Sequence, residues 1–407
     1  MKDPLEEAGL EFDARTSTRV LVLALLGLVA LFVFRPGSRT PLLLIAGIVL
    51  LIMVHEAGHY ITAKRAGMKV TEFFLGFGPR LWSFRRGETE YGIKAIPAGG
   101  YVRIIGISNL EDIDPDDEAR TFRAGRFGDR LTVILAGVTV NILIAFLLFF
   151  VVIAGQGQVV DGQSTKIVEV TGNSAASDAG FRPGDRIVAL NGRAVHDWAT
   201  VKRAIEGSAH QKITVTVVRH GREVQLAAVP RTRAGHGFLG VSPANQVRDI
   251  GAFEAVPESF RLMGDVTTSM FGVLGDRFSP SGVRDSARSI TAPAPKAGAT
   301  TADLSRPRSL IGIVDLGSQL VGTDVWGILA LLAQISLILA LFNLLPLVPF
   351  DGGHAAVVLY EWAASKVKHH QVRVDYRKLI PVSVVVLLPL LFIALSAMVL
   401  DVRQLGQ

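Results

Sequence analysis

The sequence predicts a polytopic α-helical membrane protein of about five spans, with membrane-associated β-hairpins and an inserted β-rich domain. Three observations lead to this fold class. The 407 residues are 49% hydrophobic and 19% charged, which is too apolar for an ordinary cytosolic enzyme. Several apolar runs approach the roughly 20 residues that a helix needs to cross a bilayer. Between two of these runs, residues 165–230 contain short strand-like stretches separated by turn residues.

The expected spans follow one another along the chain as residues 20–34, 41–62, 131–155, 325–348 and 379–400. The first is short for a bilayer, and the last contains Pro389, where we expect the helix to bend or break. The first apolar run ends in RPGSR, without the small residues of a cleavage site, so we expect no cleavable signal peptide.

Lys and Arg in short flanking segments predict the orientation, because such residues stay on the cytoplasmic side. Basic residues follow the second span, precede the third and separate the fourth from the fifth: Lys64, Arg65, Lys69, Arg123, Arg126, Arg130, Lys366, Lys368, Arg373, Arg377 and Lys378. All three flanks can be cytoplasmic together, which puts residues 156–324 outside; Arg35 and Arg39 oppose this scheme. We therefore expect a multi-pass protein of the cell (plasma) membrane, with the lipid bilayer as a partner. Because the net charge of +6 forms no continuous patch, we expect no nucleic-acid partner.

Residues 72–105 alternate in places between apolar and polar residues and carry Gly-rich turns, which predicts β-hairpins. Two interpretations remain open. The hairpins form a surface sheet, or one of them dips toward the membrane. The second arrangement requires that protein or a water-filled cavity covers the hairpin backbone.

Residues 165–230 predict a small β-rich domain, with strands at KIVEV, RIVAL, KITVTVVR and EVQLAAV and a helix at DWATVKRAIEG. The stretch SDAGFRPGDRIVALNGRAV (177–195) resembles a PDZ domain, with a Gly-Asp turn before a strand and an Asn-Gly turn after it. A PDZ groove accepts an extended peptide along a sheet edge. The alternative is a domain that only excludes bulky molecules and has no affinity for peptides.

Residues 256–278 have helical apolar spacing, which predicts an amphipathic helix on the outer leaflet or a helix packed on the β-rich domain. Residues 279–308 are rich in Ser, Ala, Pro, Thr and Arg and predict a linker.

The expected parts of the chain are an N-terminal segment with an extra helix, a first half of the helical core, the PDZ-like domain, the amphipathic segment with its linker, and a second half of the core. Their bounds are 1–40, 41–155, 156–235, 236–308 and 309–407.

The stretch HEAGH (55–59) ends the second expected span and carries ionisable groups where they are costly. His55 and His59 share one face of a helix, about 6 Å apart along its axis, so two imidazoles can reach one zinc ion. Glu56 adjoins this face and can act as a general base. The chain has no cysteine, so any further ligand is His, Asp or Glu. The alternative is a helix end at the membrane interface that holds no metal.

A third protein ligand is expected in NLLPLVPFDGGH (343–354), at the end of the fourth span. Besides Glu56, Asp351 is the acidic residue found within an apolar segment, and two glycines that allow close approach follow it. Its alternative role is that of a helix cap. Solvated positions are expected for the histidines of the outer domain and of the basic loop: His196, His210, His220, His236, His369 and His370.

HExxH in one span, NxxP…DGG in a later span and a PDZ-like insert between them resemble the site-2 protease family, the M50-type intramembrane zinc metalloproteases. The likeness is strongest to the bacterial branch that regulates sigma factors, including its actinobacterial members. It covers roughly residues 41–400. The stretch AGVTVN (136–141) is similar to the family's G-P-x-x-N, with Val138 where proline is usual. GFGP (76–79) resembles part of the family's membrane-associated hairpins, one of which can pair with an unwound substrate.

The resemblance implies that His55, His59 and Asp351 hold Zn²⁺ and that Glu56 is the general base. It also implies that Asn343 positions the substrate backbone or polarises the scissile carbonyl.

We therefore expect a zinc metalloendopeptidase that hydrolyses peptide bonds in or near the membrane span of single-pass proteins, in regulated intramembrane proteolysis. Anti-sigma factors and signal-peptide remnants are examples of such substrates. The active site is expected near the cytoplasmic side and the PDZ-like domain outside the cell. One alternative is a catalytically silent scaffold that presents a PDZ domain, which would lack a base or a ligand. Another is a metal transporter, which would carry polar residues along a whole pathway instead of at one depth.

Overall fold

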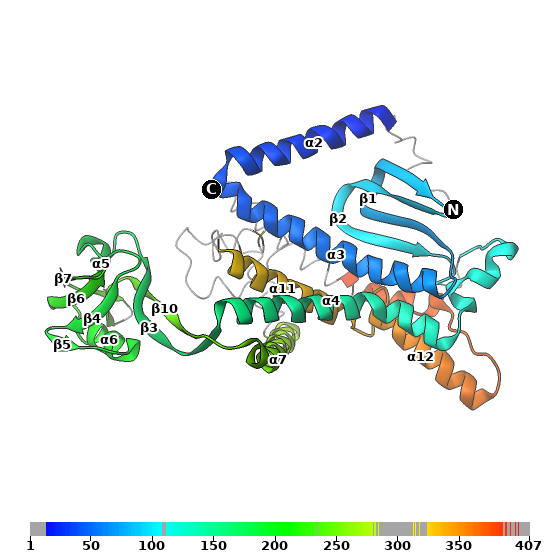
Figure 1. Cartoon of the computed structure of the whole chain (residues 1–407). Coiled ribbons are helices and arrows are strands. Elements are labelled where there is room, and N and C mark those ends of the chain that lie inside the picture. Colours follow the sequence, from blue (N-terminus) through cyan, green and yellow to red (C-terminus); the bar gives the residue numbers. More distant parts are fainter. Residues whose placement is uncertain are drawn as a thin grey trace. The chain divides into compact units, whose positions relative to one another are not determined.

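The computed structural model describes residues 14–107, 111–233, 235–279 and 324–385, together with residues 281, 284, 312, 314, 317, 387, 388, 391, 395 and 398. The chain divides into two compact units. The first combines Met1–Val152 with Ser259–Gln407 and is largely helical, and the second, Ile153–Glu258, is rich in strands (Figure 1). Most of the expected linker at 279–308 and of the expected last span at 379–400 lies outside the described residues.

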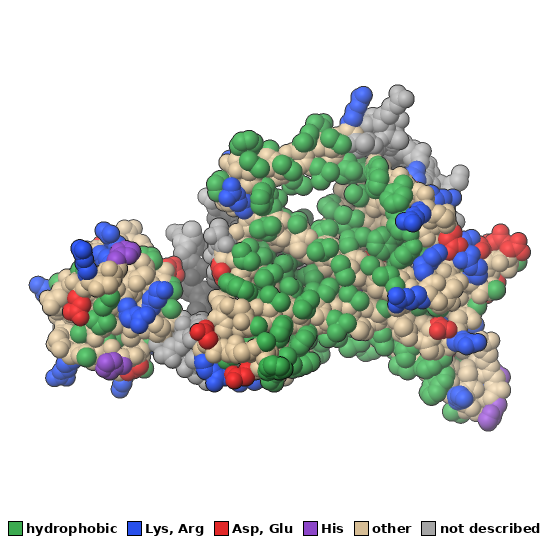
Figure 2. Space-filling model, viewed as in Figure 1, with side chains coloured by type: hydrophobic (Ala, Val, Ile, Leu, Met, Phe, Trp, Pro, Cys, Tyr) green, Lys and Arg blue, Asp and Glu red, His purple; other side chains and the backbone are tan. Residues whose placement is uncertain are grey.

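The helices of the described chain outside the β-rich segment are α2 (Ala14–Phe34), α3 (Arg39–Arg65), α4 (Phe127–Gln156), α7 (Ala252–Phe278), α11 (Val325–Asn343) and α12 (Asp351–Lys368), with short 3-10 turns η1 (Pro36–Ser38), η2 (Pro115–Arg120), η3 (Phe122–Ala124) and η4 (Tyr376–Lys378). Three described helical segments are long and apolar enough to cross a membrane: Pro36–Arg65, Phe127–Gln156 and Val325–Asn343. They correspond to the second, third and fourth expected spans. The first expected span corresponds to a shorter apolar helix, Arg19–Phe34. Figure 2 shows hydrophobic side chains over the visible face of the helical unit.

The predicted end of the fourth span at residue 348 is wrong, because α11 ends at Asn343. Proline has no N–H for a helical hydrogen bond and disfavours helical geometry in the residue before it. Pro346 and Pro349 therefore stop the helix, and the chain turns before α12 begins at Asp351.

The helices pack through small apolar clusters in the first unit. Phe149 of α4, Met263 of α7 and Leu337 of α11 are buried in one cluster. The ring of Phe260 on α7 lies 4.7 Å from the ring of Phe146 on α4. From Ser259 onward, the helix that the sequence predicts as amphipathic thus uses its apolar face to pack on α4 and α11.

The predicted hairpin region forms strands β1 (Val70–Arg86) and β2 (Thr89–Ile104), which pair antiparallel. Register shifts interrupt the pairing, so that Phe73 faces both Val102 and Tyr91. Val70 and Ile104 pair at the base of the sheet and are buried with Val133 of α4 in one hydrophobic cluster. This contact ties the sheet to the helices.

The second unit contains β3 (Gln158–Val170), β4 (Arg186–Leu190), β5 (Arg193–Ala194), β6 (Ile213–Arg219), β7 (Arg222–Ala228), β8 (Arg231–Arg233), β9 (His236–Phe238) and β10 (Val241–Arg248), with helices α5 (Ala175–Asp178) and α6 (Trp198–Glu206). Its main sheet has the order β10-β3-β4-β6-β7, with β5 paired to β4. Inward residues of the strands and of α6, such as Ile167, Val201 and Val217, form its core. The four strands and the helix predicted within 165–230 are all present.

Two predicted turns of this unit have defined geometry. Gly184 adopts φ +94°, which favours glycine, and the next residue, Asp185, is buried and receives hydrogen bonds of 2.7 Å from Arg219. Asn191 also has positive φ, and its side chain accepts a hydrogen bond of 2.8 Å from the backbone of Thr214. These bonds fix both ends of β4.

A buried ion pair joins distant parts of the helical unit. Arg130 Nη2 on α4 lies 2.8 Å from Glu361 Oε2 on α12, and the two side chains are 11% and 7% exposed. The other oxygen of Glu361 accepts a hydrogen bond of 2.8 Å from the backbone of Val374. Arg130 also lies over the ring of Phe122.

Glu361→Ala should destabilise the helical unit by about 3 to 5 kcal/mol, because it leaves the guanidinium of Arg130 buried without its partner. Thermal or chemical unfolding of the purified protein in detergent measures this change. Glu118→Ala removes a more exposed ion pair with Arg123 and should leave the unfolding midpoint nearly unchanged. Equal effects of the two variants would contradict the assignment of Arg130–Glu361 as a structural link.

Candidate active site

Helix α3 presents both histidines of HEAGH on its buried face. Its buried residues recur every three or four positions: Thr40, Leu44, Ile48, Leu51, His55, Gly58, His59 and Ala63. This spacing is that of one helix face packed against neighbours. The imidazole rings of His55 and His59 lie 4.9 Å apart on this face, and both side chains are nearly inaccessible.

Asp351 reaches the histidines from the first turn of α12, where the helix dipole favours a carboxylate. The turn that precedes α12 lies directly against its first residues. A Cβ on Gly352 would lie 2.1 Å from the carbonyl oxygen of Leu344, and one on Gly353 would lie 2.3 Å from the nitrogen of Val348. The two glycines therefore let the turn pack on the start of α12, next to Asp351.

The three side chains converge on one point. Asp351 Oδ2 lies 3.2 Å from His55 Nε2 and 3.3 Å from His59 Nε2, and the two Nε2 atoms are 3.2 Å apart. Zinc bonds of about 2.0 to 2.1 Å at tetrahedral angles put neighbouring ligand atoms about 3.3 Å apart. Asp351 Oδ2 is also buried without a hydrogen-bond partner in the described part of the chain. The donor set and its spacing thus fit a zinc ion with a fourth position open.

Helix α4 orients the ligand His59. Its Nδ1 lies 2.7 Å from the carbonyl oxygen of Val133, which can only accept, so Nδ1 carries the proton and Nε2 is free for a metal. Gly58 allows this approach, because a Cβ there would lie 3.0 Å from the carbonyl oxygen of Ala136.

Gly137 of α4 leaves room for the ligand atoms themselves. A Cβ at this position would lie 2.4 Å from His59 Nε2 and 2.7 Å from His55 Nε2. No side chain larger than hydrogen fits beside the two nitrogens. The sequence reasoning did not single out Gly137, although it lies in the AGVTVN stretch that resembles a family motif.

Glu56 is half-buried on α3, and strand β2 passes beside it. A Cβ on Gly100 of β2 would lie 3.4 Å from Glu56 Cγ and 3.1 Å from the sulfur of Met53. A peptide that extends this sheet would therefore run close to a carboxylate adjacent to the candidate metal ligands.

The other predicted residues have less defined surroundings. Asn343 is the last residue of α11 and is half-buried, and its side chain makes no hydrogen bond within the described part of the chain. The histidines predicted to be solvated are all exposed: His196, His210, His220, His236, His369 and His370. His354, one turn after Asp351, lies 3.1 Å from the hydroxyl of Tyr376.

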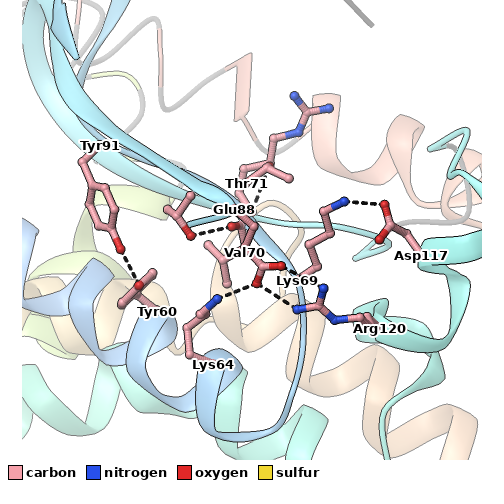
Figure 3. Close-up of polar contacts among 11 residues, drawn as sticks. Tyr60, Lys64, Lys69, Val70, Thr71, Glu88, Tyr91, Asp117 and Arg120 are labelled. Atoms are coloured by element: carbon pink, nitrogen blue, oxygen red, sulfur yellow. Dashed lines mark hydrogen bonds and ion pairs between the residues drawn. The ribbon is translucent and has the colours of Figure 1, made fainter. Parts of the chain in front are cut away.

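A polar cluster anchors the turn of the hairpin to the end of α3 (Figure 3). Glu88, in the β1–β2 turn, lies 2.5 Å from Lys64 Nζ and 2.8 Å from both terminal nitrogens of Arg120. The hydroxyls of Tyr60 and Tyr91 are 2.5 Å apart, which adds a second bond between α3 and the hairpin. The hydrogen bonds from Arg120 and Lys64 lower the pKa of Glu88 to about 2, against the opposing effect of desolvation.

Comparison with known proteins agrees with this site. The zinc metalloprotease Rip1 of Mycobacterium tuberculosis (strain H37Rv) is 34% identical over 379 residues, which cover 84% of this chain and 91% of the relative. Rip1 of Mycolicibacterium smegmatis is 31% identical, with 83% and 90% covered. A putative zinc metalloprotease of Nostoc sp. (strain PCC 7120) is 31% identical, with 79% and 86% covered.

The apolar helices and the converging ligands define a membrane zinc metalloprotease. Residues 43–389 match peptidase family M50, and the chain belongs to this family. The resemblance to site-2 proteases, including their actinobacterial branch, is thereby confirmed, as is the expected zinc cofactor.

Gly137→Ala should lower zinc affinity by about 10- to 100-fold, because its methyl group would occupy the space beside both Nε2 atoms. Competition with a chromophoric chelator measures the affinity of the purified protein. Gly128→Ala is the matched control on the same helix, since nothing lies within 4 Å of a Cβ there. Zinc affinity in Gly137→Ala equal to that of the control would show that the ion lies elsewhere.

Glu88→Gln should weaken the hairpin anchor in a pH-dependent way. Because the pKa of Glu88 is lowered in the folded state, its stabilisation is present above the ordinary value of 4.5 and is lost as the pH falls toward 2. The stability difference between wild type and Glu88→Gln, measured by unfolding at several pH values, should shrink over this interval. When Arg120→Met is also present, Glu88→Gln should change the stability at pH 6 by less than it does in the wild-type background. A pH-independent difference would argue against an ionised Glu88 in the anchor.

Proposed function

We propose that the protein hydrolyses peptide bonds in or near the membrane span of single-pass proteins, as an intramembrane zinc metalloendopeptidase. The observation that carries this proposal is the convergence of three ligand atoms, 3.2 to 3.3 Å apart, two of which lie on a helix apolar enough to cross a membrane. A soluble protease would not need to embed this cluster in such a helix.

His55, His59 and Asp351 are the proposed zinc ligands, through two imidazole nitrogens and one carboxylate oxygen. When bound, zinc supplies a Lewis acid that polarises a carbonyl and acidifies a water molecule. Nδ1 of His59 is buried and donates to the backbone oxygen of Val133, which keeps the imidazole ring in place while substrate binds.

Glu56 is the proposed general base. It accepts a proton from the attacking water and then donates it to the leaving amide nitrogen, so that one side chain serves both halves of the hydrolysis. Its place one residue after His55 on α3 supports this role, since it lies next to the ligand cluster without joining it.

The substrate helix must unwind before its carbonyls can be attacked, because a helical hydrogen bond shields them. Strand β2 beside Glu56 supports a mechanism in which the unwound segment pairs with the sheet edge. Asn343, at the end of α11, is proposed to position the substrate backbone through its amide.

The finer topology belongs to the same proposal. It comprises five spans, an active site near the cytoplasmic side and an extracytoplasmic PDZ-like domain that admits membrane-anchored remnants only after their outer domains are removed. The two defined turns around β4 in the β-rich unit support the PDZ-like assignment. Anti-sigma factors and signal-peptide remnants are substrates of the required kind.

Glu56→Gln should retain zinc and lose cleavage of a tagged single-span reporter by about 100- to 10,000-fold, the usual contribution of a general base. Immunoblotting of membranes that contain both proteins measures cleavage, and metal analysis of the purified variant measures zinc. Glu72→Gln, on the sheet but outside the ligand cluster, serves as a carboxylate control. Unchanged cleavage by Glu56→Gln would contradict the proposal.

A further inference from the structure

Asn141 lies beside the candidate metal ligands and has no role in the mechanism above. It is fully buried on α4, and its side-chain nitrogen lies 3.2 Å from His55 Nδ1. Its side-chain oxygen is buried and lacks a hydrogen-bond partner in the described part of the chain. A buried amide whose oxygen has no hydrogen-bond partner is unfavourable in a native protein and requires an explanation.

The proton positions on His55 provide that explanation. When Nε2 of a histidine binds a metal, the ring proton is on Nδ1, which then must donate a hydrogen bond. A half-turn of the Asn141 amide exchanges its nitrogen and oxygen with almost no change in shape. The oxygen then accepts from Nδ1 of His55. Without a metal, the amide nitrogen donates to Nδ1 instead, and Nε2 of His55 can donate to Asp351, 3.2 Å away.

The spacing along α4 supports the same assignment. Val133, Gly137 and Asn141 recur every four residues and form one stripe of the helix. Val133 contributes the acceptor for His59, Gly137 the space for the ligand atoms, and Asn141 the partner of His55. Ser336 of α11 donates a hydrogen bond of 2.9 Å to the backbone oxygen of Asn141, which fixes this end of the stripe.

We propose that Asn141 is a positioning residue that holds the ring of His55, through a hydrogen bond at Nδ1, with Nε2 directed at the zinc site. This inference rests on the proposed ligation of zinc by His55. An amide is suited to the position because it offers an acceptor to the metal-bound ring and a donor to the metal-free ring.

Asn141→Leu keeps a similar volume and removes both polar atoms. Its zinc affinity, measured by chelator competition on the purified full-length protein, should fall about 10- to 100-fold, as is usual when an outer partner of a ligand histidine is lost. Asn141→Asp retains an acceptor for Nδ1 and should bind zinc within about threefold of wild type. With Co²⁺ in place of zinc, the visible absorption bands should change in Asn141→Leu and resemble wild type in Asn141→Asp.

Thr139→Val is the matched control, since Thr139 is exposed on the same helix and its hydroxyl donates to the backbone oxygen of Leu135. His55→Ala separates the two levels of the proposal. If His55→Ala binds zinc like wild type, the ligand set itself is wrong. If His55→Ala loses zinc while Asn141→Leu keeps wild-type affinity, the role of Asn141 alone is overturned. Failure of Asn141→Asp to restore affinity, with unfolding like that of wild type, overturns it as well.

Discussion

The active site depends on one electrostatic constraint. A carboxylate oxygen and two imidazole nitrogens surround a space of about the size of one ion. These atoms are held 3.2 to 3.3 Å apart among helices with little access to water. Polar groups buried in such surroundings are costly unless they are paired. A divalent ion compensates all three at once, which makes the cluster tolerable inside an apolar layer.

Residues of three helices form and surround this cluster. Helix α3 supplies the two proposed imidazole ligands and the adjoining carboxylate, and α12 supplies the proposed carboxylate ligand from its first turn. Helix α4 supplies no proposed ligand. It instead presents a backbone acceptor, a gap and an amide toward the two rings. Because the proposed ligands come from separate helices, an ion bound to them would also cross-link α3 and α12.

Much of this arrangement could be predicted from local sequence. Three of the apolar runs correspond to helices long and apolar enough to cross a membrane, and the i, i+4 histidines identified one helix face. The prediction of Asp351 relied on its rarity in an apolar segment and on the family resemblance. The end of α11 was missed because hydropathy does not detect the break at Pro346. Gly137 and Asn141 were missed for a different reason. Their importance comes from their closeness to His55 and His59 in space. Both histidines lie more than 75 residues earlier in the chain, and sequence periodicity does not reveal such contacts.

The anchored turn of the hairpin has a mechanical consequence. Glu88 holds the sheet to Lys64, and Lys64 lies on the same helix as Glu56, two turns further along. The strand that passes Glu56 and the helix that carries Glu56 are therefore tied to each other by this ion pair. A peptide that extended this sheet would then lie at a separation from Glu56 that the protein's own ion pair fixes.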